Sequence, residues 1–183
     1  MKRDHSVVIR AFSFCLLAML WPVGNAAAQS EHTQQSDIGA LRAEIDALKR
    51  LLPDQAHAMV DVDYHFSNLW FAAKNENWVL SEFYLNETRS HLNWAVRLRP
   101  VRKLSSGQEL DLRAVLQGIE ASGLAEIRAA VEKRDLKDFE VAYRRMTSLC
   151  YGCHVAAEKP YLRTRLPEAP STRMIDLQPS PVR

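Results

Sequence analysis

The five residues Cys150-Tyr151-Gly152-Cys153-His154 constrain the fold of this chain more than any other segment. Two cysteines separated by two residues, with a histidine directly after the second, form the attachment pattern of c-type haem. In that pattern the two thiols add across the haem vinyl groups, and the imidazole binds the iron from one side. The fold then has to enclose a large apolar group. We expect one covalent haem on Cys150 and Cys153, with His154 as the proximal iron ligand.

Other uses of such a cysteine pair fit the surrounding sequence less well. A thioredoxin-like redox pair opens a helix just after a strand, whereas Cys150 lies late in the helical pattern of residues 136–158. A structural zinc site needs two further ligands at matched spacing, and the sequence has no second pair of that kind. A plain disulfide would leave His154 without a role.

The first 28 residues have the order of a secretory signal peptide. Three basic residues accompany a mostly apolar stretch, residues 11–21, and alanines at positions 26–28 offer a cleavage site. The apolar stretch is too short to span a bilayer. We expect cleavage near Ala28, a periplasmic location, and no membrane span after processing.

Cleavage also simplifies the composition of the chain. Of the three cysteines, Cys15 lies in the expected signal peptide, so that only Cys150 and Cys153 remain. Of the 24 basic and 22 acidic residues, the removed segment holds Lys2, Arg3, Arg10 and Asp4, which leaves 21 of each. A neutral chain gives no reason to expect nucleic acid or an anionic membrane as partner.

The remaining sequence has the periodicity of helices. Apolar residues recur at helical spacing in four stretches, at about 54–73, 77–98, 109–133 and 136–160. Before them, a/d heptad spacing relates five apolar residues, which are Ile38, Leu41, Ile45, Leu48 and Leu52. Pro53 ends this pattern. We expect residues 29–36 to be disordered, Gly123 to loosen its helix, and the prolines after residue 160 to mark an irregular tail.

Four amphipathic helices joined by short loops predict an all-α fold. The expected architecture is an antiparallel four-helix bundle with haem on the C-terminal helix, preceded by the short heptad helix. The chain then divides into a signal peptide (1–28), a polar linker with the heptad helix (29–53), the haem-binding bundle (54–160) and a proline-rich tail (161–183).

A haem motif on the last helix of an exported four-helix bundle resembles the cytochrome c-prime family, the class II cytochromes c. The specific part of the resemblance is the motif itself, and residues 139–154 also look like that family's last helix. The resemblance implies a c-type haem that serves electron transfer or the binding of small gases. The heptad before Pro53 and the long tail after Pro160 depart from the family's compact form.

The group that reaches the iron from the far side decides between those two functions. In an up-down bundle the first and last helices are antiparallel neighbours, so the residue facing His154 lies about five residues into the first bundle helix. This position is Met59, and we expect it as the distal ligand. His65 is the runner-up because it lies too far along the helix, roughly 16 Å from its start against about 7 Å for Met59.

The alternatives at the distal side stay open. Met59 suits core filling as well as ligation, and His65 suits a buried hydrogen-bonded histidine or a contact with a haem propionate. The resemblance also allows an open sixth position. We expect His57 and His91 to be ordinary surface histidines.

The sequence favours a binding and carrier protein over an enzyme. It shows no paired acid and base, no nucleophile constellation and no phosphate loop. We expect a periplasmic one-electron carrier whose partners are redox proteins; the alternative is a gas-binding (NO or CO) or peroxidase-like protein with an open distal site. A homodimer is also expected, through the heptad segment or through bundle helices as the resemblance implies. The alternative is that the heptad folds back on its own bundle.

Overall fold

The structure is a computed structural model that describes residues 23–52 and 54–180, with side chains from residue 34 onward. The expected signal peptide therefore lies almost entirely outside the described residues. The chain divides into two compact units, Met1–Leu52 and Pro53–Arg183. Each unit is described by itself.

The described residues of the first unit form one helix, α1 (Val23–Leu51). It includes residues 29–36, so the expected disorder of this segment is wrong. The segment is polar, but its glutamines and glutamate are good helix formers, and neither proline nor glycine interrupts it. Within the described residues, no helix is both long enough and apolar enough to cross a bilayer.

The apolar heptad positions of α1, together with Leu52 directly after it, are exposed to solvent. The side chains concerned are Ile38, Leu41, Ile45, Leu48 and Leu52. An isolated helix is marginal in water, and its apolar seam gains stability only when it is covered. We predict that the mature protein is a dimer by light scattering and that removal of residues 29–52 weakens the dimer. Monomers with and without the segment would rule the dimer out.

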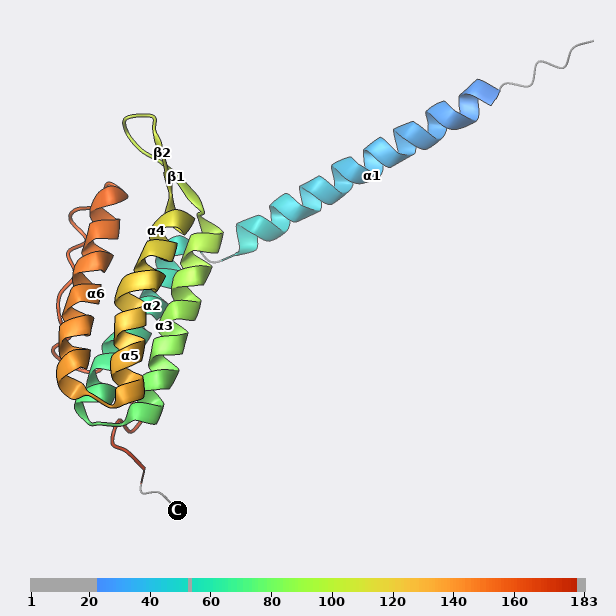
Figure 1. Cartoon of the computed structure of the whole chain (residues 1–183). Helices are drawn as coiled ribbons and strands as arrows, with labels where there is room; N and C mark the ends of the chain where they lie inside the picture. The colour runs from blue at the N-terminus through green and yellow to red at the C-terminus, as the bar shows by residue number, and fades with distance from the viewer. Residues whose placement is uncertain (1–22, 53, 181–183) are drawn as a thin grey trace, which may run out of the picture. The chain divides into compact units, whose positions relative to one another are not determined.

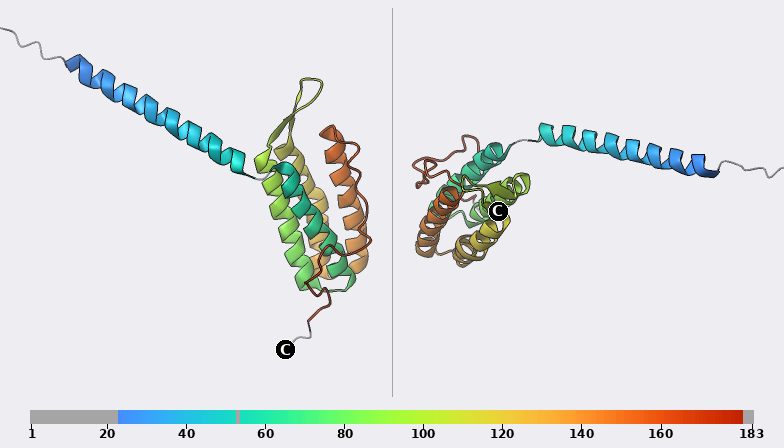
Figure 2. Two further views of the ribbon diagram at one scale, coloured as in Figure 1. Left: turned by 180° about the vertical axis from the view of Figure 1, so that it is seen from behind. Right: turned by 90° about the horizontal axis from the view of Figure 1, so that it is seen from above.

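The second unit is mostly helical, which confirms the all-α class (Figure 1). Its elements are α2 (Gln55–Lys74), α3 (Trp78–Leu98), α4 (Leu112–Ile119), a π-helical turn (Glu120–Leu124), α5 (Ala125–Lys133) and α6 (Leu136–Ala156). The segments from α4 to α5 follow one another without a break, and they lie side by side with α2, α3 and α6 (Figures 1 and 2). The core between them holds large buried side chains, including Leu69, Tyr84, Ile127, Phe139, Tyr143 and Met146.

A capping side chain starts each of four helices. Asp54, Asn77, Asp111 and Asp135 accept hydrogen bonds from backbone amides in the first turns of α2, α3, α4 and α6. Such caps satisfy amides that have no partner within the helix. The predicted starts of α2, α3 and α6 are therefore accurate. α6 ends at Ala156 and not at Pro160, because Glu158 adopts a left-handed conformation with φ of 57°.

A short β-hairpin stands where the sequence predicts only a loop and a helix start. Its strands are β1 (Val101–Lys103) and β2 (Glu109–Asp111), and Gly107 supplies the positive φ of the turn. Strands of three residues are too short to show an alternating pattern. The backbone amide of Ser105 donates to the Glu158 carboxylate at 2.8 Å, which fixes the hairpin next to the C-terminal end of α6.

Gly123 lies in the π-helical turn that interrupts the expected helix, and it also allows a close approach between two helices. It is buried in the π-helical turn, and a Cβ atom there would lie 2.8 Å from both Leu149 Cδ1 and Met146 Sδ of α6. Both contacts are closer than van der Waals distance. Because Gly123 has no side chain, α6 packs tightly against the π-helical turn. The contact is made by Met146 and Leu149, which lie just before Cys150 in α6.

We predict that Gly123→Ala lowers the free energy of unfolding by about 1–3 kcal/mol, the usual cost of overpacking. Gly118→Ala is the matched control, because a Cβ at Gly118 has no neighbour within 4 Å. There alanine should stabilise the helix by about 0.5–1 kcal/mol. Denaturant titrations of both variants measure the difference, and equal shifts of the same sign would contradict the close-packing role.

The segment after α6 is irregular, as expected, but it packs along the helices (Figure 2). Thr164 Oγ1 donates to the Thr147 carbonyl of α6 at 2.8 Å, and the amide of Ser171 donates to Asn68 Oδ1 of α2 at 2.9 Å. Further along, Leu177 is buried in the core. The tail is therefore part of the folded unit.

Candidate functional site

Both cysteines of the motif are free thiols in the last turns of α6 and pack against the core. Burial, reinforced by the neighbouring Cys153, raises the pKa of Cys150 to about 12, and burial also raises the pKa of Cys153. Redox-active and metal-binding cysteines have lowered pKa values, often at helix N-termini. Here the thiols stay protonated near the negative end of a helix dipole. This environment speaks against a thioredoxin-like pair.

A zinc site on the same cysteines also lacks support. In the described part of the chain, neither thiol belongs to a group of three or more His, Cys, Asp or Glu donors. Structural zinc requires four ligands.

The imidazole of His154 is oriented by the tail. Its Nδ1 lies 2.7 Å from the carbonyl oxygen of Leu162. A carbonyl oxygen only accepts hydrogen bonds, so Nδ1 carries the proton and the Nε2 lone pair is left for another partner. This is the arrangement of histidines that ligate metals, whose second nitrogen donates to a backbone carbonyl or a carboxylate.

Two further contacts hold the tail so that the Leu162 carbonyl stays next to His154. The Tyr151 hydroxyl donates to the carbonyl of Pro160 at 3.2 Å, and Thr164 is anchored to Thr147 as described above. Nothing in the sequence predicts Leu162 as a functional residue, because its backbone carbonyl makes the contact and its segment has no periodicity.

A groove between α4 and α6 opens beside the second cysteine. It has a volume of about 330 Å³ and is lined by Val115, Gly118 and Ile119 of α4 and by Ser148, Leu149, Gly152, Cys153 and Ala156 of α6. Cβ atoms built at Gly118 and Gly152 would meet no other atom within 4 Å. Small and apolar residues thus leave open space next to Cys153, within the range of roughly 300–1,000 Å³ for small-molecule pockets.

One contact between α2 and α6 shows where Met59 and His154 lie along the direction of the helix axes. The rings of Phe66 and Tyr143 stack with centroids 4.1 Å apart, and the Tyr143 hydroxyl donates to the Phe66 carbonyl at 2.8 Å. His154 lies eleven residues beyond Tyr143, about 16 Å, and Met59 lies seven residues before Phe66, about 10 Å. Because the helices are antiparallel, Met59 is within about 6 Å of the level of His154.

The helix also turns Met59 and His65 to different sides. Met59 and Phe66 are related by nearly two full turns, an angular difference of about 20°, so half-buried Met59 lies on the side of α2 that faces α6. His65 is about 120° away from Met59 and contacts α3 instead: its ring stacks on His91 with centroids 4.8 Å apart. The structure therefore brings His65 to α3 and not to the cysteine motif.

The two expected surface histidines have different surroundings. His57 is exposed, and its Nδ1 lies 2.8 Å from Asp54 Oδ1, as expected of a surface residue. The expectation for His91 is wrong, because its side chain is only 21% exposed. It is enclosed because α2 and α3 pack along their length at this point.

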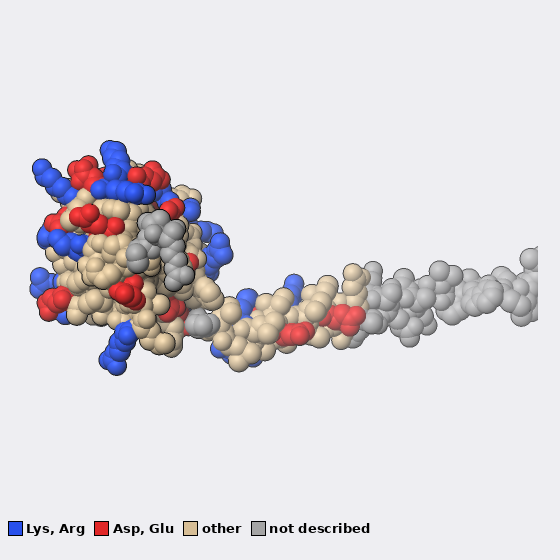
Figure 3. Space-filling view, turned by 90° about the horizontal axis from the view of Figure 1, so that it is seen from below, with Lys and Arg blue, Asp and Glu red and all other residues tan. Residues whose placement is uncertain are grey.

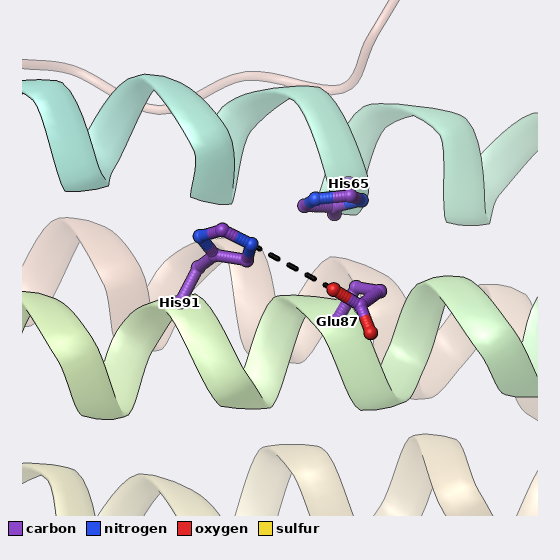
Figure 4. A group of neighbouring side chains, drawn as sticks. All are labelled: His65, Glu87 and His91. Atoms are coloured by element: carbon purple, nitrogen blue, oxygen red, sulfur yellow. Dashed lines mark ion pairs between the residues drawn. The ribbon is translucent and has the colours of Figure 1, made fainter.

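His65, Glu87 and His91 form a cluster between α2 and α3 (Figure 4). One donor atom from each lies within 4.8 Å of the others. The Glu87 carboxylate is 3.7 Å from His91 Nε2. Burial, followed by the charge of His91, lowers the pKa of His65, so that at neutral pH its imidazole is uncharged. Glu87 and His91 are one helical turn apart, and this spacing in the sequence indicates that their side chains can meet. The sequence does not indicate that His65 joins them, because His65 lies on another helix.

Compared with known proteins, the chain matches no protein-family model, no curated protein and no solved structure.

Proposed function

We propose that this chain is an exported c-type cytochrome that carries one covalent haem and transfers single electrons in the periplasm. In this proposal the helices of the second unit form a haem-binding four-helix bundle of the cytochrome c-prime kind. Cys150 and Cys153 hold the haem, and His154 ligates its iron. The observation that carries the proposal is the contact between His154 Nδ1 and the Leu162 carbonyl, which prepares Nε2 for a metal next to two free thiols.

The surroundings of the motif fit the group. The thiols are uncharged, and the groove beside Cys153 is mostly apolar, as a porphyrin requires. When bound, haem iron supplies one-electron chemistry whose potential depends on its ligands and its burial. The residues of the chain tether the group, orient the imidazole through Leu162 and exclude water with the side chains of the core.

The distal side favours electron transfer over the activation of peroxide. Activation of peroxide or oxygen requires a hydrogen-bond donor or a base above the iron. The polar candidate, His65, is engaged with His91 on the side of α3. On the side facing α6, Met59, Val62 and Phe66 offer no such group. Met59 would offer the iron a thioether as sixth ligand, and such a ligand suits a one-electron carrier.

The surface charges fit transient redox partners. On the end of the second unit that faces the viewer in Figure 3, basic and acidic side chains are interspersed. Elsewhere on the unit, Arg89 and Glu120 form an ion pair at 2.7 Å. A face with charges of both signs favours brief encounters with other proteins over the binding of a phosphate backbone.

The test is haem staining of the protein after full denaturation. The chain is produced in a host that attaches c-type haem, and its periplasmic fraction is separated on a denaturing gel. Haem that stays with a band of the mature mass supports the proposal. Haem that washes away, or a haem-free product from a host that loads a reference c-type cytochrome, overturns it.

A further inference from the structure

We propose that His65, Glu87 and His91 bind a divalent zinc ion between α2 and α3, in a second metal site that is separate from the haem motif. The donors are two imidazoles and one carboxylate, a set that zinc accepts with a fourth position left for water. The three side chains converge from two facing helices, and all three are partly buried (Figure 4).

The orphaned nitrogen atoms of the cluster point to a ligand. Among the described residues, His65 Nδ1 and His91 Nδ1 are buried side-chain atoms without a hydrogen-bond partner. A simple ion pair explains the contact of Glu87 with His91, but it leaves His65 unexplained. Enclosing a second imidazole with an unpaired nitrogen costs free energy. A metal ion that receives the lone pair of His65 removes this cost for His65, while His91 would offer its other ring nitrogen, Nε2, to the same ion.

Asp61 supplies the outer contact that ligating histidines use. Its Oδ2 lies 3.5 Å from His91 Nδ1, within ion-pair distance although outside hydrogen-bond geometry. A proton on Nδ1 is then directed to Asp61, and Nε2 faces Glu87. Carboxylates in this position fix the tautomer and raise the basicity of the ligating imidazole.

Small side-chain rotations bring the donors to ligating distance. A tetrahedral ion with bonds of about 2.0–2.1 Å separates its donor atoms by roughly 3.4 Å. The present spacing is up to 4.8 Å. Small adjustments of the imidazole rings within their packed surroundings would close this difference.

Aromatic side chains enclose the rings and restrain them. Tyr64 meets His65 edge-on with centroids 5.1 Å apart, and Trp94 lies parallel to His91 at 6.4 Å. This packing places the rings before a metal arrives. The predicted site therefore forms at little cost in side-chain entropy.

The experiment measures zinc binding by the mature, haem-loaded protein at neutral pH. The protein is treated with EDTA, freed of chelator and equilibrated with Zn²⁺, and bound zinc is counted by elemental mass spectrometry. We expect one equivalent per chain. Separate Glu87→Gln and His91→Gln variants should each lower the affinity by about 100-fold or more, and Asp61→Asn by about 10–100-fold.

His57→Gln is the matched control. His57 lies on α2 like His65, but its side chain is exposed and pairs with Asp54, which is not part of the cluster. It should bind zinc like the wild type. Glu87→Gln has nearly the same shape as the native residue, so it keeps the fold if a histidine variant does not; circular dichroism verifies this. Absence of bound zinc, or equal binding by wild type and Glu87→Gln, overturns the proposal. The absorption spectrum of the haem stays the same in these variants, which separates this site from the haem motif.

Discussion

Replacing both Cys150 and Cys153 by alanine is expected to abolish retention of haem by the denatured protein. The thioether bonds are the only links that survive unfolding, whereas an iron–histidine bond is lost when the fold opens. Single variants should keep the haem through one bond. Their absorption bands should lie at longer wavelength, because one vinyl group remains conjugated with the ring. A denaturing gel with haem staining and an absorption spectrum measure both effects.

Cys15→Ala is the matched control for these variants. Cys15 lies in the apolar stretch that is expected to be removed on export, and alanine preserves the apolar character of that stretch. Retention of haem should therefore be unchanged. Loss of haem in Cys15→Ala, or persistence of stain in the double variant, would show that the attachment residues are assigned wrongly.

The sequence predicts most helices of the second unit because local and tertiary preferences agree there. Capping residues such as Asp54 and Asp135 stand directly before amphipathic stretches, and both accept the expected hydrogen bonds. The π-helical turn at Gly123 is different. There Gly123 lies against Met146 and Leu149 of another helix, and periodicity within one segment contains no information about that contact.

The candidate site likewise has one part that the sequence predicts and another that it does not. The motif of Cys150, Cys153 and His154 is contiguous, so the sequence identifies it directly. The backbone carbonyl of Leu162 and the partnership of His65 with His91 depend on where separate segments meet. Leu162 reaches His154 because the tail turns back after α6. The left-handed backbone of Glu158 and the hydrogen bond from Tyr151 to the Pro160 carbonyl lie on this path, and neither feature can be recognised from the sequence.

Met59→Ala is expected to convert low-spin ferric iron to a high-spin or water-bound form. Met59 lies near the level of His154 on the side of α2 that faces α6, where its thioether is the one potential iron ligand among the apolar residues Met59, Val62 and Phe66. Removal of the thioether leaves the sixth position to water, a weaker ligand. Absorption and electron paramagnetic resonance spectra of the purified ferric protein measure the spin state.

His65→Gln is the comparison that gives this experiment its meaning. His65 lies about 9 Å farther along α2 than Met59, and its ring contacts His91 of α3. Its replacement should therefore leave the spin state unchanged while it weakens zinc binding. Loss of the low-spin spectrum in His65→Gln alone would show that α2 is rotated relative to the haem motif in the loaded protein. High-spin iron in wild type and both variants would instead indicate an open sixth position, and the protein would then be a binder of small gases such as NO or CO.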